Sequence, residues 1–166
     1  MIARYTNTYA DALAFATVHN LRSTPLLAFI FLVALLCAWS WLPTDVAGFV
    51  RFVIFVVLEL IFFCVLLAFQ LLFNAYWFAF NRDSNFLTEH CVELTEFAFV
   101  ESTAFTRVEI QWPGILAMRA GLGRFFVFEG PGRAHCIPVR AFATRGDFEA
   151  FVSQAKEFWH RAKSNA

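Results

Sequence analysis

The first half of the chain contains long apolar stretches, and most charged residues lie outside Leu26–Phe80. The segment Ser23–Thr44 holds no charged residue, and Trp39 and Trp41 stand near its end. About 20 helical residues cross the roughly 30 Å hydrocarbon core of a bilayer, and tryptophans gather at its two interfaces. This pattern predicts a membrane-spanning helix at about 25–42.

A second apolar run begins soon after the first one ends. Leu42–Asp45 interrupts the pattern, and Phe49–Phe80 then continues it. A short connection between two such runs predicts an antiparallel helical hairpin. We expect its second helix at about 48–76 and the whole membrane hairpin at about 23–80. Because the second run is longer than a bilayer requires, we expect it to extend past the membrane.

The basic residues beside the hairpin predict its orientation. Arg4 and Arg22 precede the first predicted helix and Arg82 follows the second, whereas the connection has Asp45 and no basic residue until Arg51. Lys and Arg near the ends of membrane helices favour the cytoplasmic side. We therefore expect a multi-pass protein with both termini in the cytoplasm.

The residues before the membrane, 1–22, predict a short strand and a helix. Ile2–Tyr5 suits a strand, and Ala10–Asn20 suits a helix. Thr6 and Thr8 both stand where an N-cap residue belongs, because their hydroxyls can accept a bond from the first helical turn. The sequence leaves the choice between these two caps open.

The residues after the hairpin, 81–166, change to short segments with alternating polarity, which indicates β-strands. A helix is predicted after Thr144, because apolar residues then recur at helical spacing as far as Trp159. The fold class that follows is an α+β membrane protein, with a two-helix hairpin and a small antiparallel sheet carrying a C-terminal helix. The expected strands are Glu89–Thr95, Phe97–Glu101, Arg107–Gln111, Met118–Ala120, Arg124–Glu129 and Arg133–Pro138.

The composition supports a membrane protein and argues against nucleic acid as a partner. Hydrophobic residues make up 60% of the chain and charged residues 16%, against roughly 45–50% and about 25% in soluble domains. The formal net charge is zero, so no basic field would attract nucleic acid. The four cysteines form no C-x-x-C pair, which favours reduced structural thiols.

The stretch 129–142 gathers two arginines, a histidine and a cysteine around a glycine turn. No serine, aspartate or second histidine lies close by in sequence to form a nucleophile and base, so we expect a scaffold hairpin without catalytic residues. His90–Cys91 and His135–Cys136 would bring like side chains together if their strands were adjacent. Zinc needs three or four ligands, and no third is evident. We therefore expect no metal and no cofactor.

Glu59 is the acidic residue of the second apolar run, and Arg51 is its basic residue. An ionisable side chain inside a bilayer costs about 2.5–3.5 kcal/mol near the centre. Glu59 and Arg51 are therefore candidates for an intramembrane polar site or a partner contact. The alternative is a Glu59 that packs, protonated or hydrogen-bonded, against the first helix.

Arginines in the predicted hairpins are candidates for contacts with lipid headgroups or with a protein. The alternative is an ordinary solvated surface. The arginines concerned are Arg119, Arg124, Arg133 and Arg140.

Several short motifs resemble those of the YcxB-like family of bacterial membrane proteins. The stretch FEGPGRAHCIPVRAF, at 128–142, resembles the C-terminal hairpin of that family. TEH at 88–90, followed by VELTE at 92–96, is similar to its first cytoplasmic strand, and Trp112 to a tryptophan after the third. YT at 5–6 and HNLRSTP at 19–25 resemble its pre-membrane segment. The resemblance implies a pleckstrin-homology-like (PH-like) cytoplasmic domain and no assigned catalytic activity.

Together these observations predict a non-enzymatic binding or regulatory protein of the bacterial inner membrane. Its expected partners are the lipid bilayer and a membrane protein, such as a toxin, or a second copy of the chain. One alternative is an immunity protein that neutralises a membrane-acting toxin. A second alternative is a subunit of a membrane enzyme or transporter, which would need a polar constellation that the sequence does not display.

Overall fold

The computed structural model describes residues 1–46, 48–80, 85–130 and 132–164. These residues form a mixed α+β fold with two antiparallel sheets. The first sheet has the order β1-β2-β3-β4 and the second has the order β5-β6-β7. The strands are β1 (Ile2–Thr6), β2 (Glu89–Leu94), β3 (Ala98–Thr103), β4 (Arg107–Gln111), β5 (Ala117–Gly121), β6 (Arg124–Gly130) and β7 (Arg133–Pro138).

Strand β1 pairs with β2 although three helices separate them in sequence. Their register sets Ala3 opposite Val92 and Tyr5 opposite His90. The inserted helices are α1 (Tyr9–Asn20), α2 (Thr24–Ser40) and α3 (Gly48–Phe80). The chain before these helices and the chain after them therefore share one sheet, and the helical insertion leaves and returns at neighbouring strands.

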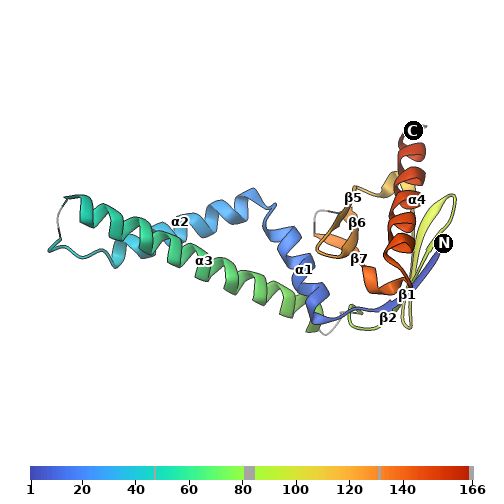
Figure 1. The fold of residues 1–166 in the computed structure, drawn as a ribbon, viewed down its shortest axis with the longest axis horizontal. Helices are drawn as coiled ribbons and strands as arrows, with labels where there is room; N and C mark the ends of the chain where they lie inside the picture. The colour runs from blue at the N-terminus through green and yellow to red at the C-terminus, as the bar shows by residue number, and fades with distance from the viewer. Residues whose placement is uncertain (47, 81–84, 131, 165–166) are drawn as a thin grey trace.

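The main core lies between the two sheets and is closed by α4 (Arg145–Ser164). Alternate residues of β2 and β6 point into it, as the period of two in a strand requires. Phe151 of α4 is fully buried there, and the indole of Trp159 donates to the carbonyl of Ile115 at 3.0 Å. Trp112, in the turn Trp112–Gly114 after β4, is 1% exposed and contacts the ring of Phe158. The helix predicted after Thr144 thus covers the opening between the sheets (Figure 1).

Helix α1 covers the opposite face of the second sheet. Phe15 packs against Phe126 and Phe128 of β6 and beside Cys136 of β7. The other side of α1 packs on the end of α3 through alanines, which allow the two helices to approach closely. These alanines are Ala12, Ala16, Ala75 and Ala79. The order of layers is therefore α3, α1, second sheet, first sheet.

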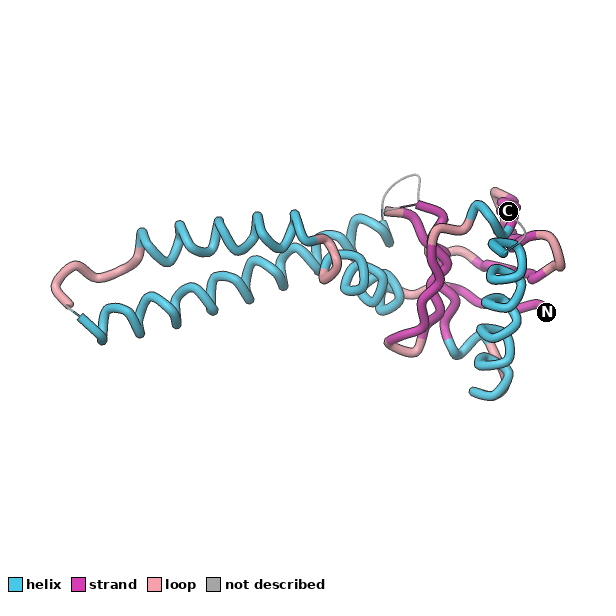
Figure 2. Tube along the Cα trace, turned by 90° about the horizontal axis from the view of Figure 1, so that it is seen from above, coloured by secondary structure: helices cyan, strands magenta, loops and turns pink. Residues whose placement is uncertain are grey.

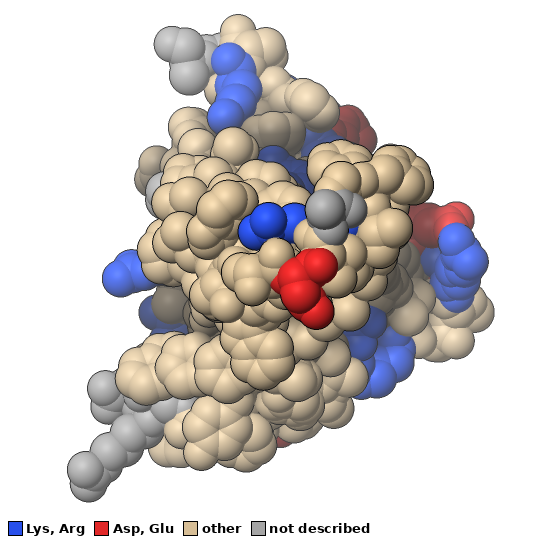
Figure 3. Space-filling model, turned by 90° about the vertical axis from the view of Figure 1, so that its left-hand side faces the viewer, with Lys and Arg blue, Asp and Glu red and all other residues tan. Residues whose placement is uncertain are grey.

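Helices α2 and α3 lie side by side and project away from the sheets, with both chain termini at the sheet end (Figures 1 and 2). The axis bends by 87° between α1 and α2. Side chains on the outside of the pair are mostly apolar and exposed, for example Phe29, Leu36 and Phe69. Figure 3, seen from the far end of this pair, shows a face made mainly of uncharged side chains.

By length and composition, α3 is a helix that could cross a membrane. It has 33 residues, and only 6% of its most apolar stretch is buried inside the structure. Helix α2 has 17 residues and meets the same criterion only together with the bent α1. Among the described residues, one of the two predicted spans therefore qualifies alone, and the second span stays a prediction.

The predicted elements agree closely with the structure, but their grouping differs. The strands form two sheets that enclose a core, and the N-terminal strand joins the first of them. Thr8 rather than Thr6 caps α1. Two features used above, Arg82 and the centre of the turn at Pro131, lie outside the described residues.

The β5–β6 hairpin turns through Leu122 and Gly123, which both have positive φ, at 53° and 68°. A two-residue hairpin loop prefers this geometry, but it favours Asn or Gly at the first position. Leu122 is strained there because an L-residue with a Cβ disfavours the left-handed region. Its side chain is 56% exposed, so little packing offsets the strain.

Replacing Leu122 with Asn should therefore stabilise the protein. We expect the free energy of unfolding to rise by about 1 kcal/mol, equivalent to a melting temperature roughly 2–4 °C higher. The measurement is thermal unfolding of the purified full chain in mild detergent. Leu122→Ala is the matched control, because it also removes the exposed apolar side chain but lacks the short polar group that lets Asn adopt the left-handed region. An equal gain for both variants would show that the exposed leucine, and not the backbone, limits stability.

Candidate functional site

Asp11 is a buried carboxylate that joins α1 to the second sheet. Its side chain is 0% exposed and accepts bonds from Arg124 of β6 and from both terminal nitrogens of Arg140. Oδ2 also accepts from the amide and hydroxyl of Thr8, at 2.7 and 2.8 Å, which caps the helix. Arg140 donates in addition to the carbonyl of Thr6 at 2.9 Å. One carboxylate therefore connects the end of β1, the start of α1 and the second sheet.

The partners of Asp11 keep it ionised. Burial raises the pKa of Asp11, but the bonds from Arg140, Thr8 and Arg124 outweigh burial and hold this pKa well below its usual range. Asp11 in turn raises the pKa of Arg140. The guanidinium groups of Arg124 and Arg140 are therefore both bound to Asp11 in structural ion pairs.

Glu101 forms a second buried cluster, between the two sheets. Its Oε2 lies 2.6 Å from Nδ1 of His135 on β7, and its Oε1 lies 3.2 Å from Nδ1 of His90 on β2. The hydroxyl of Tyr5 donates to Oε1 at 3.4 Å. The second ring nitrogen of His90 lies 3.0 Å from the carbonyl of Phe86. This cluster links β1, β2 and β3 of the first sheet to β7 of the second.

The charges in this cluster stabilise one another. Burial raises the pKa of Glu101, but the bonds from His135 and His90 outweigh it and lower this pKa to about 2. Burial lowers the pKa of His90, but the bond and the charge of Glu101 outweigh it and raise this pKa above its ordinary value. Burial, followed by the charge of Glu101, raises the pKa of Tyr5, which therefore stays a neutral donor.

The histidines of the two histidine–cysteine pairs both contact Glu101. His90 and His135 do meet, but across the two sheets and on a shared carboxylate instead of on adjacent strands. Cys136 packs against α1, and burial raises its pKa to about 12, so its thiol is unreactive at neutral pH. Within the described part of the chain, no group of three or more His, Cys, Asp or Glu could hold a metal ion.

Glu59 faces α2 from the middle of α3. It lies four residues from both Phe55 and Phe63, so the three share one helix face. Phe55 contacts Trp39, and Phe63 contacts Phe31, and both partners belong to α2. Glu59 is 8% exposed, and neither carboxylate oxygen has a hydrogen-bond partner among the described residues. The geometry is that of a carboxyl packed between two helices.

Of the other predicted site residues, Arg51 and Arg133 remain without an ion pair in the described chain. Arg51 is two helical turns from Glu59 and partly exposed, and no ion pair joins the two. Arg133 is exposed at the start of β7. Arg124 and Arg140, also predicted as headgroup or protein contacts, are instead bound to Asp11.

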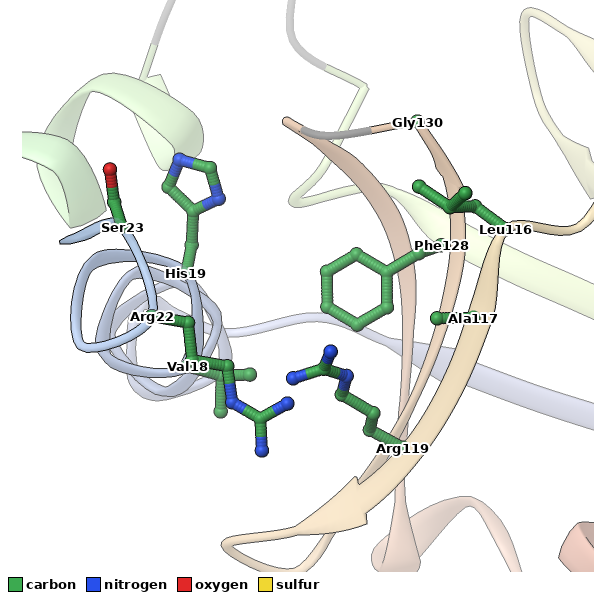
Figure 4. A pocket seen from close by; sticks show the side chains of 9 residues that line it. All are labelled: Val18, His19, Arg22, Ser23, Leu116, Ala117, Arg119, Phe128 and Gly130. Atoms are coloured by element: carbon green, nitrogen blue, oxygen red, sulfur yellow. The ribbon is translucent and has the colours of Figure 1, made fainter. Parts of the chain in front are cut away.

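A pocket of about 340 Å³ lies between the α1–α2 bend and the β5–β6 hairpin. The side chains of Arg22, from the bend, and Arg119, from β5, point toward one another across it (Figure 4). His19 and Ser23 line the helix side. Phe128 forms an apolar wall, with the guanidinium of Arg119 5.6 Å from its ring centre. The pocket is therefore a place where two cationic side chains converge.

Sequence reasoning missed the roles of Asp11 and Glu101, and it used Arg22 only to orient the hairpin. Asp11 had a local signal, since Thr8-x-x-Asp11 is a helix-capping spacing. Glu101 had none, because its partners lie in strands that are distant in sequence. The pairing of Arg22 with Arg119 also depends on tertiary contacts.

Breaking the Asp11 cluster should be costly. Asp11→Ala removes the acceptor of two guanidinium groups and the cap of α1, so we expect a loss of about 3–5 kcal/mol in the free energy of unfolding. Chemical denaturation of the full chain in detergent measures it. Glu149→Ala is the matched control, because it breaks the exposed pair with Arg145 and should cost less than about 1 kcal/mol. Equal losses would contradict the structural role of Asp11.

The Glu101 cluster should make stability depend on pH. The pKa of Glu101 is lowered from 4.5 to about 2, so its contribution is present above pH 4.5 and is lost as the pH falls toward 2. The pKa of His90 is raised above 6.5, so its contribution is present below pH 6.5 and is lost as the pH rises through the folded value.

The stability difference between the native chain and Glu101→Gln should thus be largest between about pH 4.5 and 6.5. Thermal unfolding of both proteins from pH 3 to 8 measures it, and the Asp11 contribution cancels because both retain Asp11. A difference that does not change with pH would show that the charge of Glu101 is unimportant.

The comparison with known protein families identifies part of the chain. Residues 94–155 match the family described as YcxB-like protein. No match was found among curated proteins or among solved structures. The matched range includes Trp112 and the hairpin motif at 128–142, whereas the motifs before residue 94 lie outside it. The resemblance drawn from the sequence is therefore confirmed over residues 94–155.

Proposed function

We propose that this chain is a membrane-anchored, non-enzymatic binding protein of the bacterial inner membrane, with α2 and α3 as its anchor. The observation that carries the proposal is the apolar outer surface of this helix pair. Large side chains such as Phe52, Ile61 and Phe73 are between 50% and 63% exposed. A soluble protein rarely exposes so large a contiguous apolar surface, but a bilayer would cover it.

The lengths of the helices support a span by both. Helix α3 is about 50 Å long and α2 about 26 Å, so α3 exceeds the roughly 30 Å hydrocarbon core while α2 nearly fills it. A network of side-chain amides lies where α2 begins. Gln70 donates to Asn74 at 3.2 Å, and Asn74 donates to Asn20 at 2.9 Å. Polar groups of this kind favour an interface, which supports a membrane boundary at the α1–α2 bend.

The two-sheet domain would then lie against the cytoplasmic face. Its four-stranded and three-stranded sheets with a C-terminal helix support the PH-like character that the family resemblance implies. The buried carboxylates Asp11 and Glu101 both bind other residues of this chain. Because neither carboxylate is left to act on a substrate, this favours a binding function over catalysis. A membrane protein or a second copy of this chain is the partner we expect.

Cysteine labelling tests the anchor and its topology. In a chain with its four native cysteines replaced by serine, Thr44→Cys in the α2–α3 connection should react in intact cells with a maleimide that cannot cross the inner membrane. Ser164→Cys at the end of α4 should react only after the membrane is opened. Two spans and cytoplasmic termini require this difference.

Each alternative gives a different result. Labelling of both positions in intact cells would contradict the cytoplasmic domain, and labelling of Ser164→Cys alone would reverse the orientation. If neither position reacts before lysis, both lie on the cytoplasmic side, and α3, which separates them in sequence, does not span the membrane. Release of the protein by alkaline carbonate would contradict membrane anchoring itself.

A further inference from the structure

We propose that the pocket between the α1–α2 bend and the β5–β6 hairpin binds the phosphate group of an anionic phospholipid. The inference rests on the proposed membrane anchoring, because that anchoring brings the pocket to the headgroup layer. The ligand chemistry itself comes from the side chains that converge there.

The first argument is unbalanced charge. Arg22 and Arg119 come from elements far apart in sequence, yet the fold directs both side chains into one space (Figure 4). None of the nine residues that line the pocket is acidic, and neither arginine forms an ion pair with any described residue. Two cations held close repel each other, and an anion between them removes that cost.

The contrast with the other arginines of the second sheet strengthens this argument. Arg124 and Arg140 share the buried carboxylate of Asp11. The charges of these two arginines are therefore balanced within the protein. Arg119 has no such carboxylate among the described residues, and it faces a second cation, Arg22 (Figure 4).

The second argument is the set of donors. A guanidinium presents a planar fork of N–H groups that matches two oxygens of a phosphate. Ser23 and His19 also line the pocket on its helix side, but their side chains point away from the two guanidinium groups (Figure 4). The donors that converge are therefore the two guanidinium groups. These groups suit a phosphate, which has several acceptor oxygens around one centre.

The third argument is location. Arg22 and Ser23 directly precede α2, so a bilayer that surrounds α2 would set its headgroups at this level. Leu116 lines the pocket while 55% exposed, which provides an apolar surface for the upper part of a lipid. The volume of about 340 Å³ lies within the roughly 300–1,000 Å³ typical of small-ligand sites.

The test measures lipid binding by the full chain in detergent, with native mass spectrometry as the readout. Phosphatidylglycerol should bind more tightly than zwitterionic phosphatidylcholine, and diacylglycerol, which lacks the phosphate, should bind weakest. Arg22→Gln with Arg119→Gln should weaken phosphatidylglycerol binding by about tenfold or more, because charged hydrogen bonds are lost. Arg107→Gln is the matched control, since it removes one exposed arginine of β4 and should change nothing.

Other outcomes overturn the proposal. Equal binding of phosphatidylglycerol and diacylglycerol, or no effect of the double variant in a folded protein, would exclude a phosphate site. Displacement of the lipid by millimolar inorganic phosphate would identify a small anion instead of a lipid as the ligand. Folding of the variants is checked by circular dichroism. Because binding is measured in detergent, failure here is separate from release of the protein by carbonate, which would contradict the anchor.

Discussion

The pairing of β1 with β2 is the constraint on which the rest of this structure depends. The two strands are neighbours in the first sheet although the whole helical insertion separates them. Closing so long a loop costs conformational entropy, but the cost grows only slowly with loop length. Pairing along the full strand, with Ala3, Tyr5 and Val92 buried in the core, offsets it. The helices must therefore begin and end beside the same sheet.

A second attachment fixes the direction in which the helices leave. Asp11 binds α1 to the second sheet, and Asn20 binds the end of α1 to Asn74 of α3. With α1 held on both sides, the 87° bend that follows directs α2 away from the sheets. The same bend brings Arg22 to face Arg119. The position of the arginine pocket is thus a consequence of how the insertion is anchored, and it does not depend on a flexible loop.

Local patterns predicted the elements well, and tertiary pairing explains what they missed. The strand limits at Arg107–Gln111 and Arg133–Pro138 follow from alternation and turn residues, which act within a few positions. The division into two sheets, and the place of β1 in the first, depend on contacts between distant segments. Glu101 illustrates the same limit, because its neighbours in sequence give no sign of His90 or His135. Arg124 and Arg140 were predicted to contact headgroups because the sequence does not show that both bind Asp11.

Charge is distributed between the interior and one rim of the sheet domain. Inside, both of the buried carboxylates described above have side-chain partners: Asp11 is bound by two arginines, and Glu101 lies between two histidines. Buried carboxylates without such partners would be too costly to keep ionised. At the rim beside α2, Arg22 and Arg119 lie together with no carboxylate partner among the described residues. Because the interior balances its own charges and this rim does not, the rim is suited to binding an external anion. A bilayer with anionic headgroups supplies such an anion at that level.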